Sequence, residues 1–373
     1  MSHAMSGAGP AQSWSSTTAR SAVPWIVGAA GLGAIALTRA LRRPRYDFRG
    51  KNVLITGGSR GLGLVLARQL HAAGARIVLC ARDREELDRA FDELAAAGAH
   101  ILAVPCDVTS AAVVDEMVRA VLDRWGHIDV LINNAGTIAV GPVDTMTLDD
   151  YRQAMETHFW APLHTIRAVV PHMRARHEGR IVNVSSIGGK VSVPHLLPYS
   201  ASKFALVGLS EGLRSELARD GIVVTTVIPW LMRTGSPRNA FFKGQHRTEY
   251  ALFTLSDSLP LVTVSAERAA RKIIAGCARG AAEVVVGWPA KLAVALHDFF
   301  PGLTAGLLSA VNRLLPGPGG VGVTRVAGEA SESFITRSWL TELTQRAARR
   351  NNEVPPDERR TPPPNGAKRP PNR

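Results

Sequence analysis

The sequence predicts an α/β fold with a doubly wound parallel sheet, and three observations support this prediction. Short apolar runs alternate with helix-patterned segments from residue 52 onward, beginning with N-V-L-I-T at 52–56 and L-V-L-A-R-Q-L-H at 64–71. A glycine-rich turn, G-G-S-R-G-L-G at 57–63, joins these two segments. Polar residues end two later apolar runs, at 133–134 and 185–186. Because ligands bind at the carboxyl ends of parallel strands, these residues predict a site at one edge of the sheet.

The chain in order gives seven strands in the expected spatial order 3-2-1-4-5-6-7. The strands are expected at 52–56, 76–81, 100–109, 128–136, 179–186, 221–229 and 282–287. Helices are expected at 64–71, 84–94, 110–125, 149–163, from Tyr199 to 218, and at 265–277. Asp83 precedes the second helix, where its carboxylate suits the N-cap position.

Composition allows a large core and charge argues against nucleic-acid binding. The chain has 373 residues and is 46% apolar. Net charge is +13, but residues 39–51 carry six basic side chains against one acid, and residues 346–373 carry eight against three. The body at 52–345 is therefore nearly neutral and lacks the basic face that nucleic acids require. Cys80, Cys106 and Cys277 form no metal-binding or disulfide pattern, and buried reduced thiols are expected.

The amino-terminal region predicts a membrane anchor. Residues 1–20 are small and polar and are expected to be disordered. Residues 21–38 contain no charge and are followed by a basic cluster, which predicts a transmembrane segment with the body facing the cytoplasm. Two alternatives remain open. They are a cleaved signal peptide with an A-x-A site at 34–36, and an apolar arm that lies disordered or at the membrane interface.

Two motifs predict nicotinamide chemistry. Gly57, Gly61 and Gly63 lie between a strand and a helix, where glycine lets the backbone approach a pyrophosphate; a simple tight turn is the alternative. Tyr199 and Lys203 are four residues apart on one helix face. A neighbouring ammonium lowers the pKa of a phenol, and a hydroxyl on Ser186 can hydrogen-bond a substrate carbonyl.

The glycine-rich turn, N-N-A-G at 133–136 and the Ser186, Tyr199, Lys203 set together resemble the short-chain dehydrogenase/reductase family over residues 49–290. The resemblance implies a Rossmann fold in which Tyr199 exchanges the proton, Lys203 tunes Tyr199 and binds ribose, and Ser186 orients the substrate. Ser185 is the alternative serine, but Ser186 fits the family's spacing. The implied cofactor-binding residues are Gly57, Ser59, Arg60, Gly61, Leu62, Gly63, Arg82, Asp107, Val108, Asn134, Ala135, Gly136, Tyr199, Lys203 and Thr234, and no metal is expected.

The end of the second strand favours NADP(H) over NAD. An NAD site needs a carboxylate there to accept a hydrogen bond from the ribose 2′-OH, whereas this chain has Ala81 followed by Arg82. Arg60 and Arg82 can together bind a 2′-phosphate. Solvated surface charges are the alternative for both, and Asp107 can instead lead the helix at 110–125.

Two positions depart from the family pattern. His158 replaces an Asn that holds a proton-relay water, so His158 is either a relay residue or a packed helix histidine. Trp230 replaces a Gly and is expected to narrow the pocket or alter the loop, while Thr234 remains available to the cofactor. Residues 231–262 are irregular in pattern and apolar, which predicts a substrate lid or a flap over the core.

The predicted domains are a disordered amino terminus at 1–20, an anchor at 21–38, a catalytic domain at 46–290, a helical extension at 291–345 and a disordered basic tail at 346–373. Residues 290–315 are expected to form two short helices that break at Pro301-Gly302 and pack on the body, a partner subunit or the membrane surface.

The sequence thus predicts a membrane-anchored NADP(H)-dependent oxidoreductase that interconverts a lipophilic carbonyl and a secondary alcohol, such as a steroid, a retinoid or a long-chain compound. A homodimer or homotetramer is expected from the resemblance. The alternative is a catalytically silent nicotinamide-nucleotide-binding scaffold or sensor at a membrane.

Overall fold

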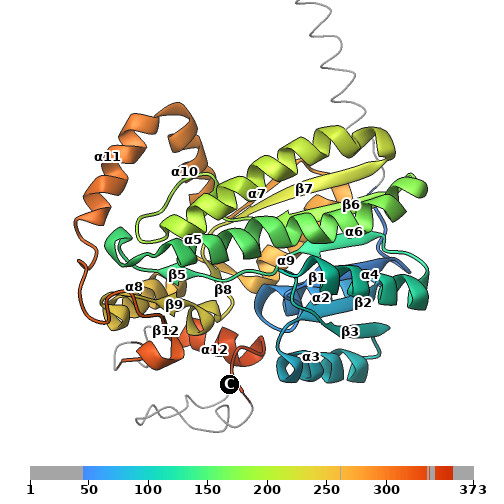
Figure 1. Ribbon diagram of the computed structural model, residues 1–373, viewed down its shortest axis with the longest axis horizontal. Coiled ribbons are helices and arrows are strands. Elements are labelled where there is room, and N and C mark those ends of the chain that lie inside the picture. The colour runs from blue at the N-terminus through green and yellow to red at the C-terminus, as the bar shows by residue number, and fades with distance from the viewer. Residues whose placement is uncertain (1–44, 261, 334–335, 337–340, 356–373) are drawn as a thin grey trace, which may run out of the picture. The chain divides into compact units, whose positions relative to one another are not determined.

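The computed structural model describes residues 45–260, 262–333, 336 and 341–355. A seven-stranded sheet forms its centre (Figure 1), and every strand pairs in parallel with its neighbours. In spatial order the strands are β3 (Ile101–Pro105), β2 (Arg76–Ala81), β1 (Asn52–Thr56), β4 (Val130–Asn133), β6 (Gly179–Val184), β7 (Ile222–Pro229) and β11 (Glu283–Val286). The expected strand order is confirmed.

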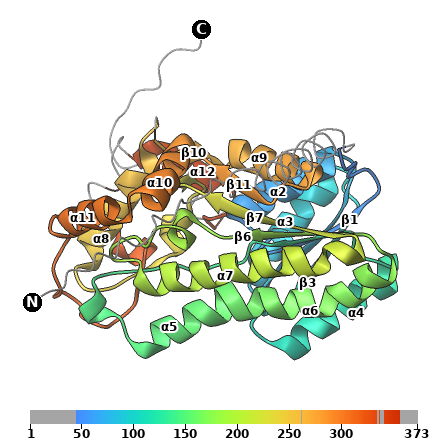
Figure 2. The ribbon, with the colours of Figure 1, turned by 90° about the horizontal axis from the view of Figure 1, so that it is seen from above.

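Helices cover both faces of this sheet, as Figure 2 shows. One face carries α2 (Gly61–Ala72), α3 (Arg84–Ala96) and α9 (Ala266–Arg279), and the other carries α4 (Ala111–Trp125), α6 (Ala161–Ala175) and α7 (Leu197–Glu216). Each face has its own apolar core, since alternate strand residues such as Ile55 and Leu54 point to opposite sides. Asp83 accepts a hydrogen bond from the Glu86 backbone N–H and caps α3, as expected. The three cysteines are buried and form no disulfide.

The connection after β1 runs to β2 on one side, whereas β4 lies on its other side. This reversal makes the carboxyl ends of β1 and β4 the switch point where a doubly wound sheet opens a crevice. The residues that follow these strands therefore lie at the mouth of that crevice.

Residues 231–262 are more ordered than the sequence predicted. They contain β8 (Met232–Arg233), β9 (Phe241–Phe242) and α8 (His246–Ser258). Two small sheets hold this region: β9 pairs with β5 (Ala139–Val140) and β12 (Val326–Ala327), while β8 pairs with β10 (Val264–Ser265). Helix α8 could not be predicted from the sequence, because its buried positions include Thr254, Asp257 and Ser258, which do not form an apolar stripe.

Helices α10 (Trp288–Phe299) and α11 (Pro301–Asn312) confirm the two expected helices and their break before Pro301. The disorder expected from residue 346 onward is not what the structure shows for 346–355. Helix α12 (Glu342–Arg350) includes the first of these residues, and Asn351, Asn352, Glu353 and Val354 are buried.

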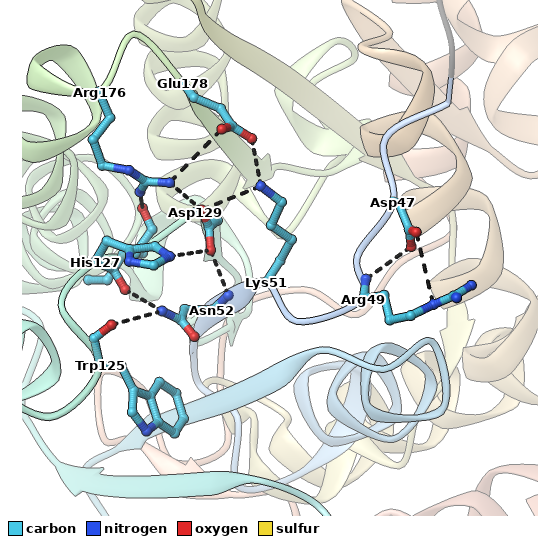
Figure 3. A network of polar contacts seen from close by, with 10 residues as sticks. Asp47, Arg49, Lys51, Asn52, Trp125, His127, Asp129, Arg176 and Glu178 are labelled. Carbon is cyan, nitrogen blue, oxygen red and sulfur yellow. Dashed lines mark hydrogen bonds and ion pairs between the residues drawn. The ribbon is translucent and has the colours of Figure 1, made fainter.

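A buried carboxylate, Asp129, organises the opposite edge of the sheet, before the start of β4 (Figure 3). It accepts hydrogen bonds from the Asn52 backbone N–H at 2.8 Å and from Arg176 at 2.7 Å, and Lys51 lies 3.8 Å away. Because Asn52 begins β1 and Arg176 follows α6, this network joins the sheet to a covering helix far from the crevice.

The segment at 21–38 and the residues of the expected amino-terminal disorder lie outside the described residues. Among the helices that the structure does describe, none is both long enough and apolar enough to span a bilayer.

Candidate active site

Ser186 and Tyr199 meet at the carboxyl end of β6. Ser186 follows this strand by two residues, is 8% exposed, and accepts a hydrogen bond from the Gly188 backbone N–H at 3.1 Å. Tyr199 lies in the first turn of α7, which begins at Leu197 and has Pro198 in its first turn, where proline is favoured. The Ser186 hydroxyl lies close enough to the Tyr199 hydroxyl to lower the pKa of the phenol. A Cβ on Gly188 would lie 3.2 Å from the Tyr199 ring, so a glycine here helps the ring approach the serine.

Lys203 is buried one turn further along α7. Its Nζ donates a hydrogen bond to the Val184 carbonyl at 2.9 Å and lies 5.7 Å from the centre of the Tyr199 ring. Burial lowers the pKa of Lys203 to about 7. The neighbouring Ser185 donates to the Lys203 carbonyl at 3.0 Å, so Ser185 fixes the helix backbone while Ser186 faces the tyrosine.

The acidity of Tyr199 differs from the sequence-based expectation. Burial raises the pKa of Tyr199, and the nearby Ser186 hydroxyl only partly opposes this. The Lys203 Nζ donates to the Val184 carbonyl and burial lowers its own pKa, so burial has the larger effect on the phenol in this arrangement. The Tyr199 hydroxyl is consequently protonated at neutral pH and can donate a proton.

His158 is enclosed by protein on all sides. It lies in a π-helical turn (Glu156–Trp160) between α5 (Leu148–Met155) and α6, and is 1% exposed. Its Nε2 accepts from the Thr137 backbone N–H at 3.2 Å, and its Nδ1 lies 2.8 Å from the Ser202 Oγ. Because Ser202 itself donates to the Tyr199 carbonyl, it accepts from Nδ1–H, which fixes the neutral tautomer. Both ring nitrogens are thus used within the protein, Nδ1 toward Ser202 on α7 and Nε2 toward the loop after β4, which favours the packed-histidine interpretation.

This arrangement predicts that His158 does not titrate in the working pH range. Burial and the nearby Lys203 hold the pKa of His158 well below its usual value. We expect His158→Gln to lower kcat about 10-fold through misplacement of Tyr199, with a pH profile between 5.5 and 8 of unchanged shape. A titrating relay would instead remove one limb of the wild-type profile. The exposed His172 on α6, replaced in the same way, is the control.

The glycine-rich turn fits the phosphates of a dinucleotide. A Cβ on Gly63 would lie 2.1 Å from the Gly57 carbonyl, and a Cβ on Gly57 would lie 2.8 Å from the Ala135 Cα. The Asn134 side chain donates to the Thr56 and Gly57 carbonyls, which ties the loop after β4 to this turn. Arg60 makes no side-chain capping bond to α2, so the amino terminus of that helix is suited to an external anion.

The structure does not leave Arg60 free for a 2′-phosphate. Its guanidinium pairs with Glu86 in the first turn of α3 at 2.5 Å and with Glu353 at 3.4 Å. Ser59 is buried and its hydroxyl also donates to Glu86. Glu86 could not be recognised from the sequence as part of this site, because an acidic residue in a first helical turn is common.

Arg82 and Asp107 lie together at the ends of β2 and β3. Both line a cavity of about 790 Å³ that reaches Arg152 and Gln153 on α5. Asp107 accepts hydrogen bonds from the backbone and the hydroxyl of Thr109, and Ser110 is the N-cap of α4. Asp107 therefore shapes the loop at this cavity and does not cap the helix.

The remaining predicted positions surround the same crevice. Leu62 and Val108 are buried in the apolar core, and a Cβ on Gly136 would lie 3.3 Å from His158 Nε2. Thr234 is 4% exposed and accepts a hydrogen bond from the Ser236 N–H. Trp230 packs with Ile187 and Val191 beneath α10, so its ring joins an apolar cluster. The space directly against Tyr199 is small, about 10 Å³, and is lined by Thr137, Ala139 and Phe241 among others.

Comparison with known proteins decides the family. The model of the short chain dehydrogenase family matches residues 51–242. The chain belongs to this family. It is therefore an oxidoreductase that acts on CH–OH groups and uses a nicotinamide cofactor.

Individual members of the short chain dehydrogenase family resemble the chain over most of its length. A Bos taurus protein named dehydrogenase/reductase SDR family member 7B is 33% identical over 77% of this chain and 89% of its own. A Burkholderia phymatum short chain dehydrogenase/reductase in complex with NAD superposes with a TM-score of 0.63 at 28% identity, over 69% of this chain and 96% of its own. A metagenomic short-chain oxidoreductase in complex with NADP gives a TM-score of 0.53 at 30% identity, over 65% and 98%.

Proposed function

We propose that this short-chain dehydrogenase is an NADP(H)-dependent enzyme that interconverts a lipophilic carbonyl compound and its secondary alcohol. The observation that supports it is the contact between Ser186 and the Tyr199 hydroxyl, with Lys203 one turn away, at the same strand edge as the glycine-rich turn.

The proposed reaction consists of a hydride transfer and a proton transfer. The reduced nicotinamide, when bound, supplies the hydride to the carbonyl carbon. The Ser186 hydroxyl orients the carbonyl oxygen, and Tyr199, protonated at neutral pH, gives its proton to that oxygen as the alcohol forms. Lys203 lies close enough to stabilise the phenolate that remains, and it is available to bind the ribose. Oxidation of the alcohol reverses these roles.

Arg82 supports the choice of NADP(H). Its side chain is exposed at the end of β2 and lines the cavity that Asp107 shares. We expect Arg82→Ala to reduce the kcat/KM preference for NADPH over NADH by about 10- to 100-fold, the contribution of one charge-assisted phosphate contact. Arg76→Ala, an exposed position at the other end of β2, is the matched control and should leave the preference unchanged. An unchanged ratio in Arg82→Ala would assign the 2′-phosphate to other residues.

The lipophilic substrate and the membrane location are supported by apolar surface. The uncharged segment at 21–38 supports an anchor with the body in the cytoplasm. Helices α10 and α11 also expose Leu292, Phe299, Leu303 and Leu307. Such exposed apolar helices suit the interface of a membrane or a partner subunit, and we propose a homodimer or homotetramer.

A carbonyl panel tests the proposal. The purified full-length protein is given NADPH with a steroid ketone, a retinal, a long-chain ketone and small polar ketones, and NADPH oxidation is followed at 340 nm. We expect turnover of at least one lipophilic compound with kcat/KM well above that of the polar compounds. Turnover of polar ketones alone would refute the substrate class, and NADH used equally well would refute the cofactor preference.

A further inference from the structure

The residues that follow α12 are buried against the glycine-rich turn. We call Asn351, Asn352, Glu353 and Val354 the C-terminal strap. None of these four residues is more than 6% exposed. Three of them are polar, so their burial requires specific partners.

The first partners belong to the turn between β1 and α2 and to α3. The Gly61 N–H, at the first residue of α2, donates to the Asn351 carbonyl at 2.9 Å. The Asn352 side-chain amide donates to the Ser59 and Glu86 carbonyls, both at 2.9 Å. Arg89 on α3 donates back to the Asn352 side-chain oxygen at 3.0 Å. The strap thus uses backbone groups of the turn that fits a dinucleotide phosphate.

Glu353 brings a carboxylate to the amino terminus of α2. One of its oxygens lies 2.6 Å from the point where a Cβ on Gly61 would stand, and the other lies 3.4 Å from Arg60 Nε. Asn239 also donates to this carboxylate. A helix amino terminus with an adjacent guanidinium is an environment that favours a negative group, whether a carboxylate or a phosphate.

The strap is also attached to the opposite side of the crevice. The Asn351 side chain donates to the Thr234 carbonyl at 3.3 Å, directly after β8. Helix α12 packs so closely on Gly235 that a Cβ there would lie 2.4 Å from the Ala348 Cα. The strap therefore connects the two loops, at Gly57–Gly63 and at Thr234, from which the cofactor contacts are proposed.

We propose that the C-terminal strap is an autoinhibitory segment, in which the Glu353 carboxylate takes the position of a nucleotide phosphate at the amino terminus of α2. This inference rests on the proposed use of a nicotinamide dinucleotide. The strap leaves this position before the pyrophosphate of the dinucleotide binds. The apparent affinity for the dinucleotide is therefore set by the fraction of molecules in which the strap is released.

The electrostatics of Glu353 make the strap displaceable. Burial raises the pKa of Glu353 to about 7, and Arg60 and the Asn239 hydrogen bond only partly oppose this. The Glu86 carboxylate on α3 raises the pKa of Glu353 further, and the buried Asp257 on α8, whose own pKa burial holds well above its usual value, also interacts with it. Above pH 7 the strap therefore holds a carboxylate that is less stable there than in water, which favours its exchange for an external anion.

Truncation tests this proposal. One variant ends at Arg350 and lacks the strap, and its matched control ends at Pro355 and lacks only the residues after the strap. We expect the dissociation constant for NADP⁺, measured by calorimetry, to be about 10-fold lower for the variant that ends at Arg350, and unchanged for the control. In the full-length protein, hydrogen exchange at 351–354 should increase when NADP⁺ is added. The double variant Asn352→Ala, Glu353→Ala should bind NADP⁺ as tightly as the variant that ends at Arg350. Because it keeps the full chain, it tests the strap even if truncation disturbs α12.

The opposite results overturn the proposal in distinguishable ways. Weaker NADP⁺ binding without the strap, or protection of 351–354 on NADP⁺ addition, would make the strap a part of the cofactor site. Equal dissociation constants for NADP⁺ in every variant would show that the strap does not compete with the cofactor. A failure of the full-length protein and of all variants to bind either NADP⁺ or NAD⁺ would refute the proposed function itself, and the autoinhibition with it.

Discussion

Replacement of Tyr199 by phenylalanine is expected to lower kcat/KM about 1000-fold, equivalent to about 4 kcal/mol of transition-state stabilisation. The substitution removes only the hydroxyl that contacts Ser186 and that would give its proton to the substrate oxygen. The ring remains packed against Gly188 and edge-on to His158 at 5.3 Å, so the fold should be unchanged. Steady-state NADPH oxidation with the best substrate of the carbonyl panel measures the loss.

Two measurements separate this chemical effect from a structural one. Tyr151→Phe removes a hydroxyl from the neighbouring helix α5 and should leave kcat/KM within about twofold of wild type, because among the described residues no hydrogen bond joins this hydroxyl to a proposed site residue. The dissociation constant of NADP⁺ should also change little in Tyr199→Phe. A Tyr199→Phe enzyme that kept more than a tenth of wild-type activity would show that another group supplies the proton.

The central sheet could be predicted because its signals are local and agree with one another. The inner strands β1, β4 and β6 are short apolar runs buried on both sides, and each is followed by a turn or a helix start. The glycines carry further information, since Gly57 and Gly63 stand where a side chain would collide with backbone. Ser186, Tyr199 and Lys203 come together because a strand end and one helix face place them, and both can be recognised from spacing.

The parts that could not be predicted depend on long-range contacts. Glu353 lies in a segment that is basic and proline-rich in sequence, and its burial follows from partners almost 300 residues earlier, such as Arg60. The pKa of Tyr199 depends on how deeply α7 is buried and on where Lys203 points, which spacing alone does not show. The role of His158 likewise depends on the Thr137 backbone and on Ser202.

Replacement of Asp129 by asparagine is expected to lower the free energy of unfolding by about 2 kcal/mol, less than the roughly 3–5 kcal/mol typical for loss of one partner of a buried ion pair. Asp129 is fully buried, whereas Arg176 and Lys51 are about 30% exposed and keep Glu178 as a second partner (Figure 3), which limits the loss. Because the network lies at the amino edge of the sheet, kcat/KM at 25 °C should not change. Urea unfolding of both proteins measures the difference, with the exposed Asp123 on α4 replaced by asparagine as the control.

The pH dependence of this difference tests its electrostatic origin. Burial raises the pKa of Asp129, but the hydrogen bonds from Arg176 and the Asn52 backbone, with His127 and Lys51 nearby, outweigh burial and hold this pKa below its usual value. A carboxyl group with a lowered folded-state pKa stabilises the fold above its unfolded pKa and loses this effect as pH falls through the folded value. The gap between wild type and Asp129→Asn should therefore be constant from about pH 6 to 8 and should close below about pH 4. A gap that persists in acid would mean that Asp129 acts through shape and packing, and not through its charge.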